Sequence, residues 1–219
     1  MVTKRLATLV AAIAVCVGAA VPASASAQDP ILFVHGYVES ASLWNTMIAN
    51  FEKDGYPKSY LSAYSYNTSQ SNKIDAEEVK TKVEALLKST GATKVDIIAH
   101  SMGSLNSRYY IKNLGGESKV DDWVSLGGPN HGTETANFCF STSCVEMRVG
   151  STFLKELNAT DETPGAVNYG TWWSPCDEII NPDSSVALTG ATNTKTACIS
   201  HTALTTDSTV YTQVREFVK

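Results

Sequence analysis

Short apolar segments alternate along this chain with segments whose apolar residues recur at helical spacing. The predicted strands cover residues 30–34, 60–66, 94–99 and 120–126, and the predicted helices cover residues 42–51, 79–87 and 101–114. The first strand is a continuous apolar run, which is typical of a strand buried on both faces of a parallel sheet. Repeated strand–helix–strand units need crossovers that place helices on both faces of that sheet. The pattern therefore predicts an α/β fold with a mostly parallel central sheet.

The second half of the chain gives weaker signals. Residues 129–166 are rich in turn-forming residues and only weakly periodic. A strand ending at Trp173, a short strand-like piece over residues 197–199 and a terminal helix containing Val210 and Val214 are expected after it. In open sheets of this class the chemistry lies at the carboxyl ends of the strands, so the residues that follow each strand are the candidates for a site.

The overall charge excludes one class of partner. The chain has 219 residues, with 17 Lys plus Arg against 22 Asp plus Glu and a sequence pI near 5.4. It has no basic cluster, so binding to nucleic acid is not expected. Apolar residues make up 43% of the chain, which is enough for an ordinary core, and we expect one compact domain and a monomer.

The N-terminal segment has the features of a secretory signal peptide. Two basic residues precede an apolar, Ala-rich run over residues 6–21, and small residues follow as far as Ala27. The run is shorter than the ~20 residues that a membrane-spanning helix needs, and it ends in residues suited to cleavage. We therefore expect residues 1–27 to be removed and residues 28–219 to form a single extracellular domain with no integral membrane segment.

Four cysteines remain after that segment: Cys139, Cys144, Cys176 and Cys198. An even number in an oxidising compartment favours disulfides, and four cysteines allow three pairings. Because the two clusters lie far apart in the sequence, we expect the pairs Cys139–Cys144 and Cys176–Cys198. The spacing of Cys, His and carboxylate residues matches neither a zinc site nor a calcium loop, so no metal is expected.

Ser101 is the candidate nucleophile. It lies between a predicted strand and a predicted helix, in the segment Ala99-His100-Ser101-Met102-Gly103. This context is typical of a nucleophile elbow, which exposes the serine hydroxyl above the sheet. The elbow needs small residues two positions before and two after the serine, and Ala99 and Gly103 meet that need. The alternative interpretation is an ordinary turn.

A serine hydroxyl needs a base to take its proton, and histidine is the usual one. Of the four histidines, His35 ends the first strand and His100 faces away from the Ser101 side chain, so neither has the right direction. For His131 the acid would have to come from the start of a strand, at the opposite end of the sheet. His201 has no such difficulty and fits the order serine, acid, histidine that hydrolases of this class follow.

The acid must lie between the serine and the histidine in the chain. The acidic residues at plausible strand ends there are Glu134, Asp161, Asp177 and Asp183. Asp177 directly follows an apolar strand and its turn, and a Cys176–Cys198 bridge would hold its loop against the loop of His201. Asp177 is therefore the expected acid, with Asp183 second and a surface role as the alternative.

Two backbone N–H groups are needed to stabilise the oxyanion of a tetrahedral intermediate. Met102, which follows the nucleophile, is expected to supply one. The turn after the first strand, Val34-His35-Gly36-Tyr37, is expected to supply the other through Tyr37. An ordinary turn that ends a strand is the alternative.

These segments together resemble the small secreted bacterial lipases of the class 2 lipase family, in particular the minimal lipases of bacilli. The matching stretches are Val34-His35-Gly36, Thr90 to Gly103 with its Ala-His-Ser-Met-Gly elbow, Tyr109 to Leu114 and Leu126-Gly127-Gly128. The resemblance is close over residues 30–128 and afterwards reduces to Asp177 and His201. It implies an α/β-hydrolase fold and hydrolysis of triacylglycerols and other carboxyl esters without a cofactor, with Ser101, Asp177 and His201 as the triad. The substrate would be a lipid ester at an oil–water interface.

The segment after Leu126-Gly127-Gly128 departs from the minimal lipases because it is longer and contains two cysteines. Pro129-Asn130-His131-Gly132-Thr133 is instead similar to a motif of larger bacterial lipases, which leaves open whether residues 129–166 form a lid. A short-chain esterase or a polyester hydrolase would use the same triad, and the exposed Trp172-Trp173 pair could serve either or only pack against the protein. A binding protein without catalysis on the same scaffold is the alternative from a different class.

The segment between Asn137 and Met147 carries more large apolar side chains than a connecting loop needs. These are Phe138, Phe140, Val145 and Met147. Since the segment follows a predicted strand, it should emerge on the same side of the sheet as Ser101. We expect it to form one wall of an acyl-binding cleft and an apolar surface for lipid aggregates. A satellite core beneath the loop is the alternative.

Overall fold

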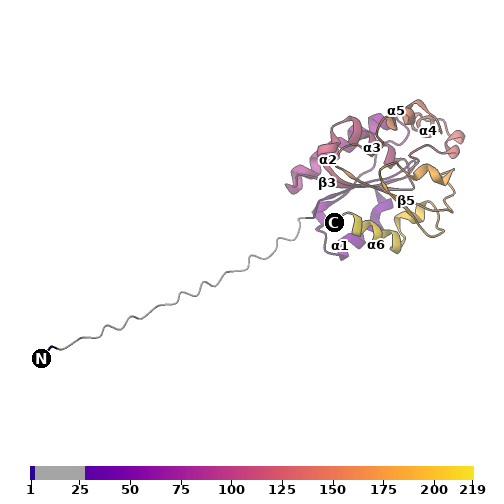
Figure 1. The fold of residues 1–219 in the computed structure, drawn as a ribbon. Helices are drawn as coiled ribbons and strands as arrows, with labels where there is room; N and C mark the ends of the chain where they lie inside the picture. Colours follow the sequence, from indigo (N-terminus) through magenta and orange to yellow (C-terminus); the bar gives the residue numbers. More distant parts are fainter. Residues whose placement is uncertain (3–27) are drawn as a thin grey trace.

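A parallel sheet forms the centre of the computed structural model, which describes residues 1–2 and 28–219 (Figure 1). The predicted signal peptide thus lies outside the described residues except for its first two positions. The strands are β1 (Ile31–Val34), β2 (Leu61–Ala63), β3 (Val95–His100), β4 (Val120–Leu126), β5 (Asn168–Trp173) and β6 (Thr192–Lys195). Their order is β2-β1-β3-β4-β5-β6, and every neighbouring pair is parallel. The carboxyl ends of all the strands therefore lie at one edge.

Helices cover both faces of this sheet (Figure 1). The α-helices are α1 (Asn45–Lys53), α2 (Asn72–Thr90), α3 (Gly103–Asn113), α4 (Thr142–Met147), α5 (Thr152–Leu157) and α6 (Ser208–Phe217). Short 3-10 helices are η1 (Ala41–Trp44), η2 (Lys58–Tyr60), η3 (Gly116–Ser118), η4 (Glu134–Phe138), η5 (Asp183–Val186) and η6 (Thr202–Thr205). Helices α2 and α3 lie on one face, and α1 and α6 lie on the other.

The two faces explain the continuous apolar run of β1. Leu32 and Val34 pack into the core beneath α2 and α3, whereas Ile31 and Phe33 pack into the core beside α1 and α6. Successive side chains of a strand point to opposite faces, so a strand covered on both sides needs apolar residues at every position. The α/β prediction is confirmed by this arrangement.

Some predicted elements differ from the structure. Residues 197–199 are not a strand; the last strand is β6, whose four residues are polar and mostly exposed. An edge strand that buries little surface carries no apolar pattern, which is why the sequence did not indicate it. The predicted exposure of the Trp172-Trp173 pair is wrong for Trp172. Its side chain is buried against Phe217, with 5.5 Å between ring centroids. In the described part of the chain, no helix is long and apolar enough to cross a membrane.

Candidate active site

Ser101 lies at the sharp turn between β3 and α3. Its φ is +54°, a left-handed conformation that is uncommon for a residue other than glycine, and its side chain is 7% exposed. The Ser101 N–H donates to the Leu126 carbonyl at 2.9 Å, which ties the turn to the end of β4. A Cβ atom at Gly103 would lie 2.5 Å from the carbonyl oxygens of Val34 and His35, so only glycine fits two positions later. This is the backbone geometry of a nucleophile elbow.

Asp177 and His201 form a hydrogen-bonded pair at the same edge of the sheet. His201 Nδ1 and Asp177 Oδ2 are 2.7 Å apart, and both side chains are almost completely buried. The other oxygen, Asp177 Oδ1, accepts the backbone N–H groups of Ile179 and Ile180, each at 2.9 Å. The carboxylate therefore has a fixed direction, and it holds the imidazole with Nδ1 toward the acid.

Burial and hydrogen bonding act in opposite directions on this pair. Burial alone raises the pKa of Asp177, but the hydrogen bonds from His201, Ile180 and Ile179 outweigh it, and the pKa lies below its ordinary value. For His201, burial lowers the pKa more than the Asp177 carboxylate raises it, so the pKa lies below 6.5. The pair is therefore a neutral imidazole beside an ionised carboxylate at neutral pH, the state in which a histidine can accept a proton.

The loops that carry the pair are joined twice. A disulfide connects Cys176 to Cys198, in the pairing that the sequence predicted. Beside it, the buried Ser174 hydroxyl donates to the Ile199 carbonyl at 2.5 Å and accepts the Ile199 N–H at 3.0 Å. The chain before Asp177 is thus held against the chain before His201 by a covalent bond and by hydrogen bonds.

The other candidates for base and acid lie elsewhere. The His131 ring bonds to Glu162 at 2.7 Å, and His35 stacks on Tyr66 with 4.3 Å between ring centroids. Among the described residues, none of the carboxylates of Glu134, Asp161 or Asp183 hydrogen-bonds to a histidine; Glu134 accepts from Asn181, Asp161 accepts from Thr163, and Asp183 begins η5. Asp177 and His201, the residues chosen from the sequence, are hydrogen-bonded to each other.

The backbone after β1 forms a turn beside Ser101. Gly36 N–H donates to Glu39 Oε2 at 2.7 Å, and Val38 N–H donates to Thr68 Oγ1 at 3.2 Å. Within residues 28–219, neither Tyr37 N–H nor Met102 N–H has an acceptor. These are the two groups that the sequence indicated as oxyanion donors. A Cβ atom at Gly36 would lie 2.6 Å from Ser101 Cβ, so glycine is needed for the turn to approach the serine.

An apolar cavity of about 390 Å³ opens at this site. Ser101 and His201 lie in its lining. The other lining residues come from the turn after β1, from η4 and its two flanking residues, from the end of α4, from the loop after Asp177 and from the start of η6; they are Tyr37, Val38, Glu39, Thr133, Thr135, Ala136, Phe138, Cys139, Met147, Ile179, Ile180 and Thr202. In the contacts of the described residues, no hydrogen bond joins Ser101 Oγ to the His201 ring. Such contacts are often long without substrate and shorten in the reacting complex.

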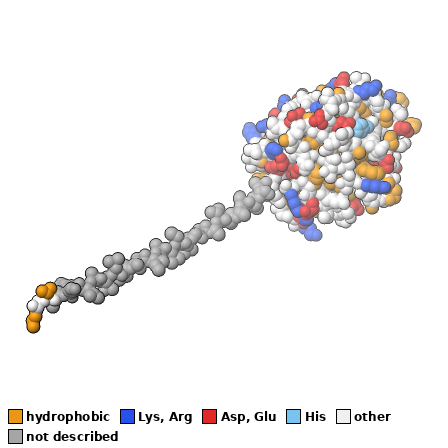
Figure 2. Space-filling model, viewed as in Figure 1, with side chains coloured by type: hydrophobic (Ala, Val, Ile, Leu, Met, Phe, Trp, Pro, Cys, Tyr) orange, Lys and Arg blue, Asp and Glu red, His pale blue; other side chains and the backbone are white. Residues whose placement is uncertain are grey.

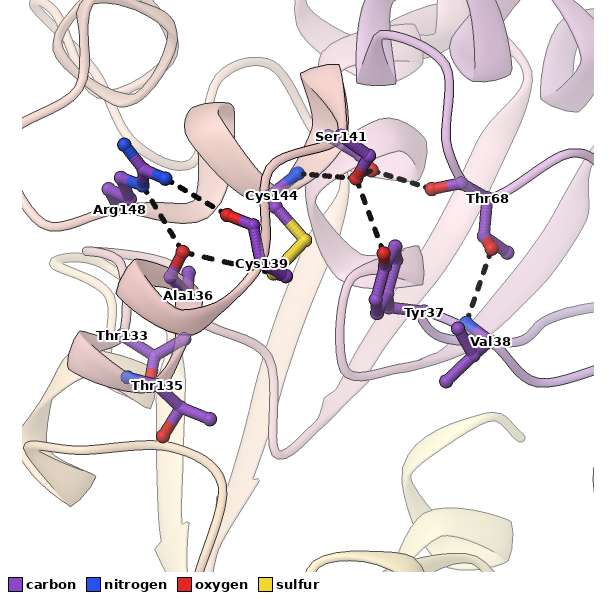
Figure 3. The surroundings of a disulfide bond; sticks show 11 residues. Tyr37, Val38, Thr68, Thr133, Thr135, Ala136, Cys139, Ser141, Cys144 and Arg148 are labelled. Atoms are coloured by element: carbon purple, nitrogen blue, oxygen red, sulfur yellow. Dashed lines mark hydrogen bonds between the residues drawn. A yellow bond between two sulfur atoms is a disulfide. The ribbon is translucent and has the colours of Figure 1, made fainter.

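The segment around the second disulfide forms one side of this cavity. Cys139 is bonded to Cys144, and Arg148 donates to the carbonyls of Cys139 at 2.9 Å and Ala136 at 3.1 Å (Figure 3). On the other side of the bridge, Ser141 Oγ donates to the Tyr37 hydroxyl at 3.4 Å (Figure 3). The segment is therefore fastened to the turn that carries the proposed oxyanion donor.

Its apolar side chains divide between core and surface. Met147 is buried in a small cluster beneath the segment, whereas Phe138 and Phe140 are 86% and 83% exposed. Figure 2 shows hydrophobic side chains along the edge of the molecule where this segment lies. Phe138 lines the cavity and Phe140 does not, so the predicted wall and the alternative satellite core are each present in part.

Three residues of this edge were not found by sequence reasoning. Ser174 joins the two loops, Glu39 accepts from the turn after β1, and Glu178 accepts the His201 backbone N–H at 3.0 Å. Glu39 could have been noticed as an acidic residue within the turn after the first strand. Within the described residues, no group of three or more His, Cys, Asp or Glu side chains could hold a metal ion.

Comparison with known proteins identifies the family of the chain. Residues 28–217 match the family model described as Lipase (class 2). The triacylglycerol lipase of Pseudarthrobacter phenanthrenivorans is 26% identical over 120 residues, which are 52% of this chain and 37% of that protein. The triacylglycerol lipase of Pseudomonas fragi is 28% identical over 139 residues, 63% of this chain and 46% of that protein. The matches thus span less than half the length of these relatives.

Solved structures share the fold. The mature form of Bacillus licheniformis lipase BlEst2 superimposes with a TM-score of 0.78 at 18% identity, covering 92% of this chain and 96% of that one. Aspergillus fumigatus lipase B gives a TM-score of 0.72 at 16% identity, covering 84% and 51%. At these identities the likeness concerns the fold, which is that of the α/β-hydrolases.

Proposed function

Since this chain belongs to the class 2 lipase family, we propose that it is a serine hydrolase of carboxyl esters and that its substrates are lipid esters such as triacylglycerols. The observation that carries the proposal is the 2.7 Å contact between Asp177 and His201, together with the cavity that both His201 and Ser101 line. A neutral, oriented imidazole beside a serine on an elbow is the arrangement that nucleophilic acyl transfer needs. The apolar lining suits an acyl chain.

The proposed reaction begins when Ser101 Oγ attacks the ester carbonyl and His201 Nε2 takes the hydroxyl proton. Asp177 stabilises the imidazolium that forms, and the N–H groups of Tyr37 and Met102 stabilise the oxyanion. The intermediate collapses to an acyl-enzyme, and His201 gives its proton to the leaving alcohol. Water, deprotonated by His201, then attacks the acyl carbon; the Ser101 Oγ–acyl bond breaks to release the fatty acid, and His201 returns its proton to Ser101 Oγ. Each step moves one proton through one side chain and needs no cofactor.

Two features support a lipid rather than a small soluble ester as the substrate. Phe138 lies at the border between the cavity and the surface, and the neighbouring exposed Phe140 extends an apolar surface beyond it. We propose that these side chains contact a lipid aggregate. The Arg148 and Ser141 hydrogen bonds keep the segment in place, which favours a fixed wall over a lid.

The proposal also includes secretion of a monomer. Residues 1–27 would be removed as a signal peptide, and the two disulfides are compatible with an oxidising compartment. N-terminal sequencing of protein from the culture medium tests this, and a mature chain beginning at Gln28 is expected. Retention of Lys4 and Arg5 in the exported protein would exclude cleavage at this site.

The function is tested by turnover with the purified protein. We expect hydrolysis of p-nitrophenyl butyrate and of an emulsified triacylglycerol, and a loss of kcat on the order of a million-fold in Ser101→Ala with an unchanged melting temperature. A matched control is Ser118→Ala, a change on η3 at a residue outside the cavity lining. Absence of turnover in the wild type would favour a binding protein. Turnover of soluble esters only would favour an esterase.

A further inference from the structure

Glu39 connects the turn after β1, which carries Tyr37, to His100, which contacts His201. Its Oε2 atom accepts the Gly36 N–H at 2.7 Å and lies 2.9 Å from His100 Nδ1. The other ring nitrogen, His100 Nε2, lies 3.2 Å from the His201 carbonyl, and the two imidazole rings are 4.5 Å apart between centroids. One carboxylate oxygen thus reaches the turn after β1 and, through one imidazole, the backbone of His201.

The first consequence concerns the turn. Glu39 holds Gly36 N–H and Thr68 holds Val38 N–H, so the N–H between them, that of Tyr37, is left free to meet a substrate. The position of an oxyanion donor must be accurate to well under 1 Å for its full effect. A fixed acceptor on Gly36 supplies that accuracy at the residue directly before the donor.

The second consequence concerns charge. Burial alone raises the pKa of Glu39, but the hydrogen bond and charge of His100 and the Gly36 N–H outweigh it, and the pKa lies below its ordinary value. Glu39 is therefore ionised at neutral pH. Its negative charge favours the positive form of His201 and so acts in the same direction as Asp177.

We infer that Glu39 is a positioning residue for ester hydrolysis, which holds the turn of the oxyanion donor through Gly36 and holds His201 through His100. The inference rests on the proposed function. Glu39 does not itself take part in bond making; it acts through its two partners and through its charge on the imidazolium that forms during the reaction. A role confined to folding would need the hydrogen bonds but not the charge.

The charged and titratable neighbours of His201 and Glu39 determine how kcat/KM depends on pH. His201 faces the carboxylates of Asp177 and Glu39 and the ring of His100, while Glu178 contacts its backbone N–H. Glu39 faces His100, His201 and His35. Removing the Glu39 charge takes away one of the two carboxylates that raise the pKa of His201, so the acidic limb of kcat/KM should move to lower pH.

The test compares Glu39→Gln, Glu39→Asp and the control Glu134→Gln on p-nitrophenyl butyrate. Glu134 is an exposed carboxylate on η4 that lies outside the cavity lining. For Glu39→Gln we expect kcat to fall about tenfold with KM within about twofold, the acidic limb to shift to lower pH and the melting temperature to stay as in the wild type. Glu39→Asp should restore the acidic limb toward that of the wild type, because the charge returns. The control should match the wild type throughout.

Two results would overturn the inference: a wild-type kcat in Glu39→Gln, or an acidic limb that stays in the same place. If Glu39→Gln were less stable than the wild type, the pH profile of kcat/KM for Glu39→Asp would decide alone. The inference predicts that its acidic limb returns toward the wild-type position with the restored charge, whereas a purely structural role predicts no such return. These outcomes are separable from failure of the proposed function, which would appear as absent turnover in the wild type or as full turnover in Ser101→Ala.

Discussion

His201 owes its proposed role to three neighbours that a single sequence position does not reveal. Asp177 fixes its ring, Glu178 accepts its N–H, and His100 contacts its carbonyl. His131, by contrast, bonds to Glu162 and is 41% exposed at its side chain. The two histidines are therefore held by carboxylates of different loops, and only one of the two rings lines the cavity.

We predict that His201→Ala and His131→Ala differ strongly. The first removes the proposed base and should lower kcat by on the order of a million-fold, because triad members act as a unit. The second removes one partly exposed contact with Glu162 and should change the free energy of unfolding by about 1 kcal/mol or less, with activity kept. Steady-state kinetics on a nitrophenyl ester, with melting curves of both variants, checks this. If His131→Ala abolished hydrolysis and His201→Ala did not, the base would be wrongly assigned.

The pH dependence of activity follows from the direction of the His201 pKa. Burial lowers it below 6.5, so the imidazole stays neutral into mildly acidic solution and kcat/KM should fall to half only below that pH. Asp177→Asn removes the hydrogen bond that raises this pKa. The acidic limb should then move further down, with a loss of roughly 10⁴ in kcat from the wrong tautomer. An acidic limb of the wild-type kcat/KM profile with its midpoint above pH 6.5 would contradict this prediction.

At the scale of elements, the loop after β5 and the loop before η6 behave as one unit. The Cys176–Cys198 bridge joins cysteines 22 positions apart, and Ser174 joins the same two loops by hydrogen bonds. The Cys139–Cys144 bridge joins cysteines only 5 positions apart, within the segment that lines the cavity. The two bridges should therefore differ in their effect on stability and on catalysis.

We predict that Cys176→Ala/Cys198→Ala lowers the free energy of unfolding by about 3 kcal/mol by the chain-entropy model. It should also lower kcat, because the acid and the base lose their common support. The comparison variant, Cys139→Ala/Cys144→Ala, removes a bridge of the cavity wall that does not connect Asp177 to His201, and it should cost less stability and less kcat on short esters. Denaturant unfolding and kinetics of both double variants give the comparison. Equal losses of kcat would show that the first bridge does not support the pair.

The exposed phenylalanines give a second prediction at this scale. Phe138→Ser/Phe140→Ser should reduce hydrolysis of emulsified long-chain esters about tenfold or more while short-chain activity is kept, because apolar contact with the aggregate is lost. Ile74→Ser is the control, since Ile74 is an exposed apolar residue of α2 outside the cavity lining. Rates of hydrolysis measured over a series of acyl chain lengths show whether the loss is confined to long-chain, emulsified esters. Uniform loss on all esters with a lower melting temperature would indicate a structural role instead.

At the scale of the whole molecule, buried carboxyl groups gather at the edge of the sheet opposite Ser101. Asp96 and Asp122 lie near the amino ends of β3 and β4, and burial raises the pKa of both, that of Asp122 to about 6. Asp122 N–H donates to Asp96 Oδ1 at 3.2 Å, and Asn168 Nδ2 donates to Asp122 Oδ1 at 2.9 Å. The neutral form of these carboxyls is the one that the fold favours.

The raised pKa of Asp122 sets how the stability of the protein depends on pH. The neutral Asp122 carboxyl contributes stability that is fully present below the ordinary pKa of 3.8 and is lost as the pH rises through about 6. Asp122→Asn keeps an oxygen for Asn168 and removes the buried charge, so it should stabilise the protein at pH 8 by on the order of 1 kcal/mol. At pH 4 the difference should nearly vanish. Melting curves of the variant and the wild type at both pH values check this, and a variant that is less stable at pH 8 would contradict it.

Local features of the sequence were sufficient for much of this fold. The elbow around Ser101 is visible because its steric needs fall within five consecutive residues, and the strand β1 is visible because burial on two faces requires apolar side chains throughout. The fold class followed from the repeated alternation of such segments. The choice of Asp177 and His201 came from chain order and strand ends, and their catalytic roles remain a prediction.

Tertiary structure alone decided the contacts between segments distant in the chain. Glu39 meets His100 across 61 positions, and Ser174 meets Ile199 across 25. The strand Thr192–Lys195 exists because β5 offers it an edge, and Trp172 is buried because Phe217 packs on it. Periodicity and short-range sterics are properties of neighbouring residues, so a sequence displays them directly. Which side chains meet across the sheet depends on strand order, register and packing, and these arise only when the whole chain has folded.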